Sequence, residues 1–209
     1  MVGGHAGRGG LRERKKQRTR EALSLAAIRL AVERGWAAVT VEDIAAAADV
    51  SVRTFRNYFS GKAEAVAARH LDRMRRIADE LRVRPGDEPL WEALVSSVEA
   101  QFAPDEDLDA VPAPDPAQVD GVRVMLTEPA LQGELARAHA LAQDELAAAI
   151  AERTGTDPAR DLYPALVAAA AGSAVAVAIE HCLRAEAPTP LGPVLRDALE
   201  QLRAGLPVP

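Results

Sequence analysis

The chain has 209 residues, of which 48% are hydrophobic, 3% are aromatic and one is a cysteine. This length is sufficient for one or two domains with a buried core. The single cysteine, Cys182, excludes an internal disulfide framework and a cysteine-rich zinc site, and it favours a reducing, cytoplasmic setting. The first 20 residues are rich in glycine and arginine and lack the apolar stretch that a secretion signal requires.

The net charge of −6 conceals an uneven distribution of charge along the chain. Residues 1–62 carry 12 basic and 6 acidic side chains, whereas the other 147 residues carry 13 basic and 25 acidic ones. A basic first third on an acidic body indicates that the first third binds a polyanion and that the rest has another role.

The basic third begins as a tail and continues as a helix. Residues 1–11 have too little apolar surface to offset the entropy of ordering, so we expect a disordered tail there. From residue 12 onwards the pattern becomes helical, and apolar side chains three and four positions apart predict an amphipathic helix that ends at Gly35.

Two short helices are predicted next, joined by a tight turn. Thr40 and Ser51 stand at N-cap positions and predict helices over residues 41–48 and 52–58. Two such helices behind a basic segment have the dimensions of a helix-turn-helix. The second helix is expected to bury Phe55 and to turn its polar side chains toward the major groove of DNA.

Polar residues of this segment are candidate DNA contacts. Arginine and asparagine can hydrogen-bond the edges of guanine and adenine, so Arg53, Arg56 and Asn57 are candidates for base readout. Hydroxyl and ammonium groups nearby suit phosphates. The predicted DNA-contacting residues are Arg18, Thr40, Val41, Ser51, Val52, Arg53, Thr54, Arg56, Asn57, Tyr58 and Lys62.

The rest of the chain predicts further helices and no convincing strand, so the predicted fold class is all-α. Helix-like stretches cover residues 62–82, 90–102, 116–126, 129–153, 158–186 and 190–204, several of them opening near a proline. We expect a first domain over residues 12–62, a connecting helix over 62–82 and a second domain over 83–209. The acidic, proline-rich segment 103–116 is typical of a loop between helices.

The stretch from Arg18 to Val66 resembles the DNA-binding domain of the TetR family of bacterial regulators. The positions that match at the family's spacing are Thr40-Val41, Ile44-Ala45, Val50-Ser51, Thr54-Phe55, Tyr58-Phe59 and Lys62. Arg56 and Asn57 stand where the family often has an aromatic residue and a histidine, which predicts a different operator sequence. The resemblance implies a homodimer that binds double-stranded operator DNA through an N-terminal helix-turn-helix, and a helical ligand-binding and dimerisation domain behind it. It also implies that a small-molecule inducer releases the repressor.

Larger side chains of the later helices are candidates for a ligand site. They are Trp91, Phe102, Arg123, Met125, Leu126, His139 and Tyr163. Trp91 and Tyr163 each have a polar group that needs a partner when buried. The five acids of segment 103–116 favour an uncharged or cationic apolar ligand, whereas Arg123 favours an anionic one.

The last two long helices are candidates for the dimer interface, because small residues and leucines recur there at helical spacing. The predicted interface residues are Ala168, Gly172, Ala176, Leu195, Leu199 and Leu202. Residues 162–179 are uncharged and reach the lower length limit of a membrane span, but eight of these 18 residues are alanine. We therefore interpret them as a buried helix and expect no membrane association.

No enzyme activity, metal site or cofactor is predicted. The four histidines and Cys182 do not have ligand spacing, and no glycine-rich loop follows a strand. Two alternatives to a ligand-released repressor stay open. The first is a DNA-binding activator or constitutive silencer without a ligand. The second is a helical RNA-binding or enzymatic protein. RNA-binding proteins usually expose aromatic side chains that stack on bases, whereas Phe55 and Phe59 are expected to be buried, which does not favour RNA binding.

Overall fold

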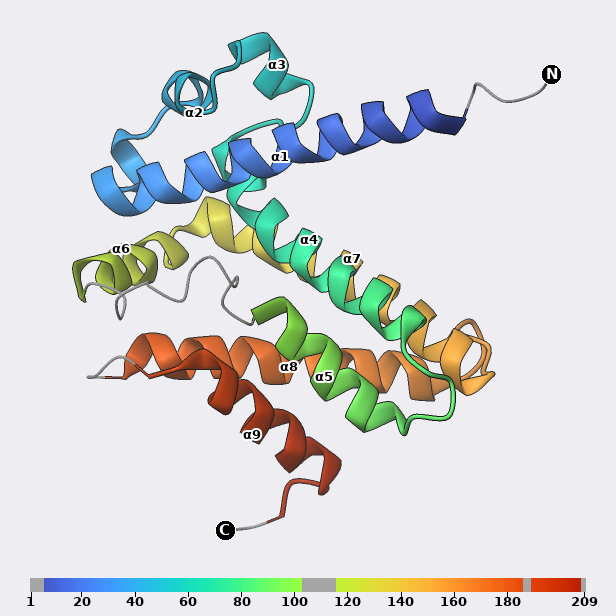
Figure 1. Ribbon diagram of the computed structural model, residues 1–209. Helices are drawn as coiled ribbons and strands as arrows, with labels where there is room; N and C mark the ends of the chain where they lie inside the picture. Colours follow the sequence, from blue (N-terminus) through green and yellow to red (C-terminus); the bar gives the residue numbers. More distant parts are fainter. Residues whose placement is uncertain (1–5, 103–115, 186–188, 208–209) are drawn as a thin grey trace, which may run out of the picture. The chain divides into compact units, whose positions relative to one another are not determined.

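The computed structural model describes residues 6–102, 116–185 and 189–207, and every regular element in those ranges is a helix (Figure 1). The elements are α1 (Ala6–Arg34), the 3-10 helix η1 (Trp36–Ala38), α2 (Val41–Ala47), α3 (Val52–Arg56), α4 (Lys62–Val83), α5 (Leu90–Phe102), α6 (Pro116–Leu126), α7 (Pro129–Thr154), α8 (Leu162–Arg184) and α9 (Leu191–Arg203). The predicted all-α class is confirmed.

Two helices start more than one residue away from the predicted position. Helix α1 begins at Ala6, so residues 6–11 of the predicted tail are helical, because each residue added to an existing helix gains a hydrogen bond without a new nucleation cost. Helix α8 begins at Leu162 instead of residue 158. The Asp157 carboxylate accepts a hydrogen bond from the backbone of Ala159 at 2.9 Å, and the Asp161 carboxylate accepts one from the backbone of Asp157 at 2.8 Å, which holds this segment in a turn. The predicted loop 103–116 lies outside the described residues except for its last position.

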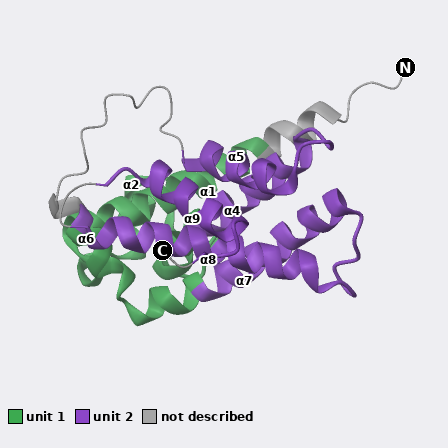
Figure 2. Cartoon of the chain, turned by 90° about the horizontal axis from the view of Figure 1, so that it is seen from below, with its two compact units in different colours: residues 1–69, 120–135 green, residues 70–119, 136–209 purple. Residues whose placement is uncertain are grey.

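The helices form two compact units (Figure 2). Unit 1 comprises residues 1–69 and 120–135, and unit 2 comprises residues 70–119 and 136–209. Helices α4, α6 and α7 contribute residues to both units. The compact units do not follow the domain boundaries predicted at residues 62 and 83. Those boundaries stay a prediction.

Unit 1 is organised around aromatic and aliphatic side chains from its first helices. Helix α1 packs against α2, and α2 packs against α3 (Figure 1). The rings of Phe55 and Phe59 lie 5.7 Å apart between centroids, and the Ser24 hydroxyl of α1 donates to the backbone carbonyl of Ala65 in α4. The large, completely buried side chains of this core are Leu23, Ile44, Phe55, Phe59 and Leu131.

Helix α6 approaches α1 closely at Gly121. A Cβ atom added to this glycine would lie 2.8 Å from the carbonyl oxygen of Val32 and 3.0 Å from its Cγ1. Real Cβ atoms essentially never come so close to a backbone oxygen, so the contact requires glycine. The segment of α6 that belongs to unit 1 is thus seated on the last turns of α1.

Unit 2 packs α9 against both α8 and α5, with Leu195 and Leu199 of α9 completely buried. Arg153 of α7 closes the turn between α4 and α5. Its guanidinium donates to the carbonyls of Pro85 at 2.5 Å and Glu88 at 2.6 Å, and only 8% of its side chain is exposed. The nearly buried guanidinium of Arg153 therefore stabilises this turn, and its own burial is compensated by hydrogen bonds to backbone carbonyls.

The close approach at Gly121 predicts a measurable loss of stability for Gly121→Ala. Alanine is favoured over glycine in a helix by about 1 kcal/mol, but overpacking against a backbone carbonyl costs about 1–3 kcal/mol. We expect a net decrease in the free energy of unfolding, measured by urea denaturation. Gly133→Ala is the matched control because the added Cβ would have no neighbour within 4 Å, and we expect it to stabilise the protein slightly. Equal stability of the two variants would contradict the close contact.

Candidate functional site

Helix α2 is fixed at its start by a capping box. The Thr40 hydroxyl accepts a hydrogen bond from the backbone of Asp43 at 3.1 Å, and the Asp43 carboxylate accepts one from the backbone of Thr40 at 2.9 Å. The hydroxyl and backbone donors of Thr40 hold the pKa of Asp43 below its usual range. The position of the first turn of α2 is therefore set by two residues three apart in the sequence.

Helix α3 begins after a turn of four residues, 48–51, all of which are exposed or half-buried. Asp49 has a φ of 53°, in the left-handed region that aspartate tolerates better than most residues. Ser51 caps α3: its hydroxyl accepts from the backbone of Thr54 at 3.0 Å and lies 2.8 Å from the Thr54 hydroxyl. The two caps, at Thr40 and Ser51, together set the register of both helices of the helix-turn-helix.

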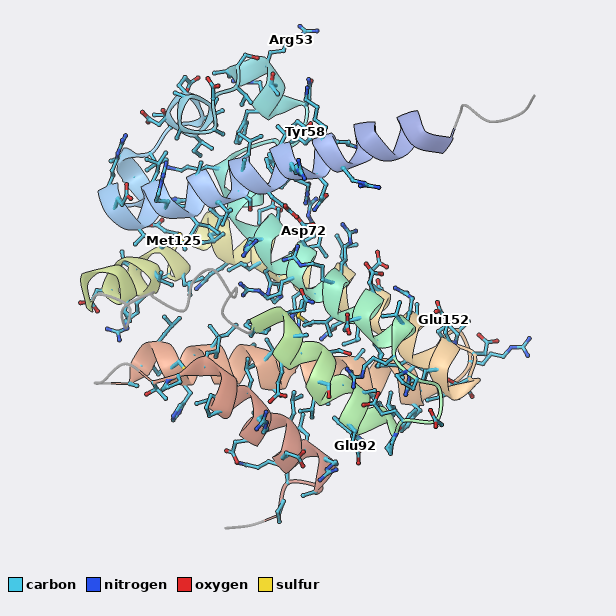
Figure 3. All side chains as sticks on the ribbon, viewed as in Figure 1. Arg53, Tyr58, Asp72, Glu92, Met125 and Glu152 are labelled. Carbon is cyan, nitrogen blue, oxygen red and sulfur yellow. The ribbon has the colours of Figure 1, made fainter. Side chains whose placement is uncertain are left out.

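Helix α3 has one buried side and one polar, exposed side. Phe55 is completely buried, and this fixes the rotation of the helix about its axis. Arg53, Arg56 and Asn57 are exposed, and Figure 3 shows the Arg53 side chain leaving α3 on the side away from α1. The three side chains chosen from the sequence for base readout are thus presented together on the outer surface of unit 1.

The other predicted DNA contacts have more varied surroundings. Arg18 is exposed on α1, close to the exposed Arg14, Lys15 and Lys16. Thr40 and Ser51 are exposed, and their hydroxyls serve as helix caps. The remaining side chains of the predicted set are half-buried: Val41, Val52, Thr54, Tyr58 and Lys62.

Lys62, the first residue of α4, makes contacts that the sequence pattern did not predict. Its ammonium donates to the backbone carbonyls of Trp36 at 2.5 Å and Val39 at 2.9 Å, and it lies 4.6 Å from the centre of the Trp36 ring. These contacts join the start of α4 to the segment that precedes Thr40. The assignment of Lys62 to a DNA phosphate stays a prediction, and the structure adds a second role, that of positioning the start of α2.

The ligand-site candidates fall in both units. Arg123, Met125 and Leu126 belong to unit 1, where Met125 is buried and Arg123 is exposed and donates to the Asp120 carboxylate at 2.7 Å. The other four belong to unit 2. Trp91, Phe102 and His139 are half-buried there, and Tyr163 is exposed.

Unit 2 also contains a polar cluster that includes two residues which the sequence analysis did not select, His70 and Arg73. The rings of His70 and His139 stack at 5.8 Å between centroids, and the Arg73 guanidinium lies 4.4 Å from the centre of the Phe102 ring. His70 and His139 are 69 positions apart in the sequence, so no local sequence pattern predicts their contact. Among the described residues no three His, Cys, Asp or Glu side chains are grouped so that they could hold a metal ion.

Most of the predicted dimer-interface residues are buried within the protomer. Leu195 and Leu199 belong to the core of unit 2, and Ala168 is completely buried. Gly172 faces α7, since a Cβ added there would lie 3.0 Å from Cε1 of His139. Of the predicted set only Ala176 is exposed, and Leu202 is half-buried. Ala168 and Gly172 of α8 therefore pack inside unit 2.

A different side of α8 is exposed and apolar. Leu162, Leu166 and Val177 are 77%, 62% and 61% exposed, respectively, and Ala176 and Ser173 lie on the same side of the helix. Helix α8 is the one helix in the described part of the chain that is long and apolar enough to cross a membrane by length and composition. Core helices of soluble proteins pass the same test, so this property alone is weak evidence for a span.

Comparisons with known proteins cover both parts of the chain. The family described as "Bacterial regulatory proteins, tetR family" matches residues 25–68, and the family described as "MftR C-terminal domain" matches residues 88–207. The HTH-type transcriptional regulator TcmR of Streptomyces glaucescens is 30% identical over 160 residues, which are 77% of this chain and 71% of TcmR.

Two similar solved structures support the fold. One is the fatty acid degradation regulator FadR from Bacillus halodurans, with a TM-score of 0.53, 16% identity, and coverage of 90% of this chain and 96% of FadR. The other is SmeT, the repressor of the Stenotrophomonas maltophilia multidrug efflux pump SmeDEF, with a TM-score of 0.53, 20% identity, and coverage of 91% and 96%. With its helix-turn-helix and with family matches to both parts of the sequence, the chain belongs to the TetR family of bacterial transcriptional regulators and is a DNA-binding regulator.

Proposed function

We propose that this regulator is a cytoplasmic, homodimeric repressor that a small-molecule ligand releases from its operator. The observation that carries the DNA-binding part is the polar face of α3: Phe55 anchors the helix, while Arg53, Arg56 and Asn57 are exposed together. A recognition helix of this kind enters the major groove, and a dimer presents two of them to successive turns of DNA. Repression and its release are typical of the family.

Release by a ligand requires two arrangements of the dimer with different operator affinity. A ligand that binds better to the arrangement with the wrong spacing of recognition helices lowers operator affinity by its differential binding energy. In this proposal residues 12–62 bind DNA, helix 62–82 connects, and residues 83–209 bind the ligand and the second subunit.

The exposed apolar side of α8 supports the dimer. Large apolar side chains exposed along one side of a helix are typical of a protein–protein interface. We assign the interface to the side of α8 that carries Leu162, Leu166 and Val177, instead of the side with Gly172, because the latter already packs against His139. Ala176 is common to the predicted interface and to this exposed side.

Base readout by α3 predicts a change of sequence preference in Arg53→Ala and Arg56→Ala. Loss of a bidentate contact to a base costs about 1–3 kcal/mol and relaxes discrimination at one operator position. Binding-site selection on random DNA measures this preference. Arg18→Ala is the control, because a lost phosphate contact weakens all sequences alike. Unchanged base preference in both α3 variants would move the readout elsewhere, to Val52 and Asn57.

The two roles of Lys62 predict different salt dependences of operator binding. If Lys62 contacts a phosphate, Lys62→Ala flattens the slope of log K against log salt by about 0.9, as we expect for Arg18→Ala. If Lys62 positions α2 through the carbonyls of Trp36 and Val39, the slope is kept while affinity and thermal stability fall. The two existing acceptors lead us to expect the second result. Equal flattening in Lys62→Ala and Arg18→Ala would assign Lys62 to phosphate.

The proposed α8 interface predicts that Leu166→Glu and Val177→Glu weaken the dimer. Each would bury a carboxylate without a partner, at a cost of several kcal/mol. We expect sedimentation to show monomers, and operator binding to fall although α3 is unchanged. Val83→Glu is the control, since Val83 is 76% exposed but lies at the end of α4. A stable dimer of both α8 variants would place the interface on another surface.

A further inference from the structure

The outer side of α3 is defined by the angular positions of its residues around the helix axis. Successive residues are about 100° apart, so Arg53 and Asn57 each lie about 160° from Phe55, whereas Arg56 lies about 100° from it. Asn57, the C-cap, keeps helical dihedral angles of φ −75° and ψ −15°, and its backbone N–H donates to the carbonyl of Arg53 at 3.2 Å. Exposure agrees with this order, because the three polar residues are exposed and Phe55 is completely buried. Arg53 (Figure 3) and Asn57 therefore point most directly away from the core of unit 1, with Arg56 beside them.

Three hydroxyls and one ammonium near α3 already have partners within unit 1. The Thr40 hydroxyl accepts from the backbone of Asp43 at 3.1 Å and donates to the Asp43 carboxylate at 2.5 Å. The hydroxyls of Ser51 and Thr54 lie 2.8 Å apart, and Ser51 also accepts from the backbone of Thr54 at 3.0 Å. The Lys62 ammonium donates to two backbone carbonyls. These groups hold the helix-turn-helix together, so the outer side of α3 is the best source of hydrogen bonds to bases.

The rise of the helix sets the distance between the three polar side chains along a groove. At 1.5 Å per residue, Asn57 lies about 6 Å and Arg56 about 4.5 Å from Arg53 along the axis of α3. Successive base pairs of DNA are about 3.4 Å apart. In a recognition helix that lies along the major groove, the three side chains therefore face three consecutive base pairs, in the order Arg53, Arg56, Asn57.

The functional groups of these side chains each match one base edge in the major groove. A guanidinium donates two parallel hydrogen bonds, and guanine presents two acceptors there, O6 and N7. A carboxamide donates one hydrogen bond and accepts another, and adenine presents the acceptor N7 beside the donor N6. Hydrogen bonds from a charged donor are stronger than neutral ones, so the two arginines make the larger contribution to specificity.

We propose that each operator half-site carries two guanines and one adenine in three consecutive base pairs, which Arg53, Arg56 and Asn57 read in that order. This inference rests on the proposed function and specifies the DNA that it requires. The purines can lie on either strand, because the major groove shows the base edges of both strands. Since a homodimer presents α3 twice about a two-fold axis, the same three base pairs recur in inverted orientation in the second half-site.

The first step of the test finds the operator and its essential purines. The full chain selects bound duplexes from random DNA, and the enriched sequence is expected to hold two adjacent G·C pairs and then an A·T pair in each half. Each purine of this triplet is then replaced, one at a time, by its 7-deaza analogue, in which a C–H group stands in place of N7 and Watson–Crick pairing is kept. Each 7-deazaguanine is expected to lower affinity about tenfold, and 7-deazaadenine about fivefold, because one hydrogen bond to the protein is lost.

The second step assigns each base to one side chain. In Arg53→Ala, 7-deazaguanine in the outer G·C pair of the triplet should have no further effect, whereas the analogues at the other two pairs keep their full effect. Arg56→Ala should cancel only the effect at the middle pair, and Asn57→Ala only the effect at the A·T pair. Arg18→Ala is the control, because the loss of an exposed cation of α1 that contacts phosphate should leave all three analogue effects unchanged.

The analogue series on the wild-type chain needs no variant, so it decides even where a variant does not fold. The proposal is overturned if the enriched half-site lacks the triplet, if the 7-deaza analogues bind as well as the natural purines, or if an α3 variant cancels the effect at a position other than its own. A chain that enriches a palindrome without this triplet keeps the proposed operator binding and loses this readout. A chain that enriches no sequence from random DNA overturns the operator binding itself, and the readout with it.

Discussion

The buried pair Phe55 and Phe59 is the constraint on which the proposed DNA-binding surface depends. Phe55 occupies the inner side of a five-residue helix, and a helix so short has little stability of its own. Its rotation and depth are therefore set by tertiary packing. Because Phe55 occupies the buried side of the helix, Arg53, Arg56 and Asn57 lie on its exposed side. The chain has only seven aromatic residues, and two of them are used to hold this one short helix.

Helix α8 shows how an apolar helix divides its surface between two tasks. One side buries small residues, and Gly172 lets His139 of α7 approach its backbone. The opposite side exposes Leu162, Leu166 and Val177. In sequence both sides are apolar, so a helical pattern does not distinguish which one packs within the protomer. The sequence pattern therefore predicts a dimer interface on the small-residue side, and the structure shows that Ala168 and Gly172 of that side pack within the protomer.

The parts of the molecule that could be predicted from the sequence are those determined by near neighbours. Thr40 and Ser51 predict the starts of α2 and α3, because the side chain of an N-cap residue accepts a hydrogen bond from a backbone N–H three residues later. Unpredicted features depend on distant contacts: the ammonium of Lys62 reaches carbonyls 23 and 26 positions earlier, and His70 meets His139 from another helix. The late start of α8 has a local cause, because Asp157 and Asp161 form a turn that competes with the helix.

Helix α4 links the two proposed activities through its own residues. It contributes Lys62 to unit 1, where the ammonium binds the carbonyls of Trp36 and Val39 before the cap at Thr40, and it contributes His70 and Arg73 to unit 2. A ligand that favours one position of α4 over another shifts the population by its differential affinity. In the proposed function, a ligand and the operator would then compete for the placement of one helix.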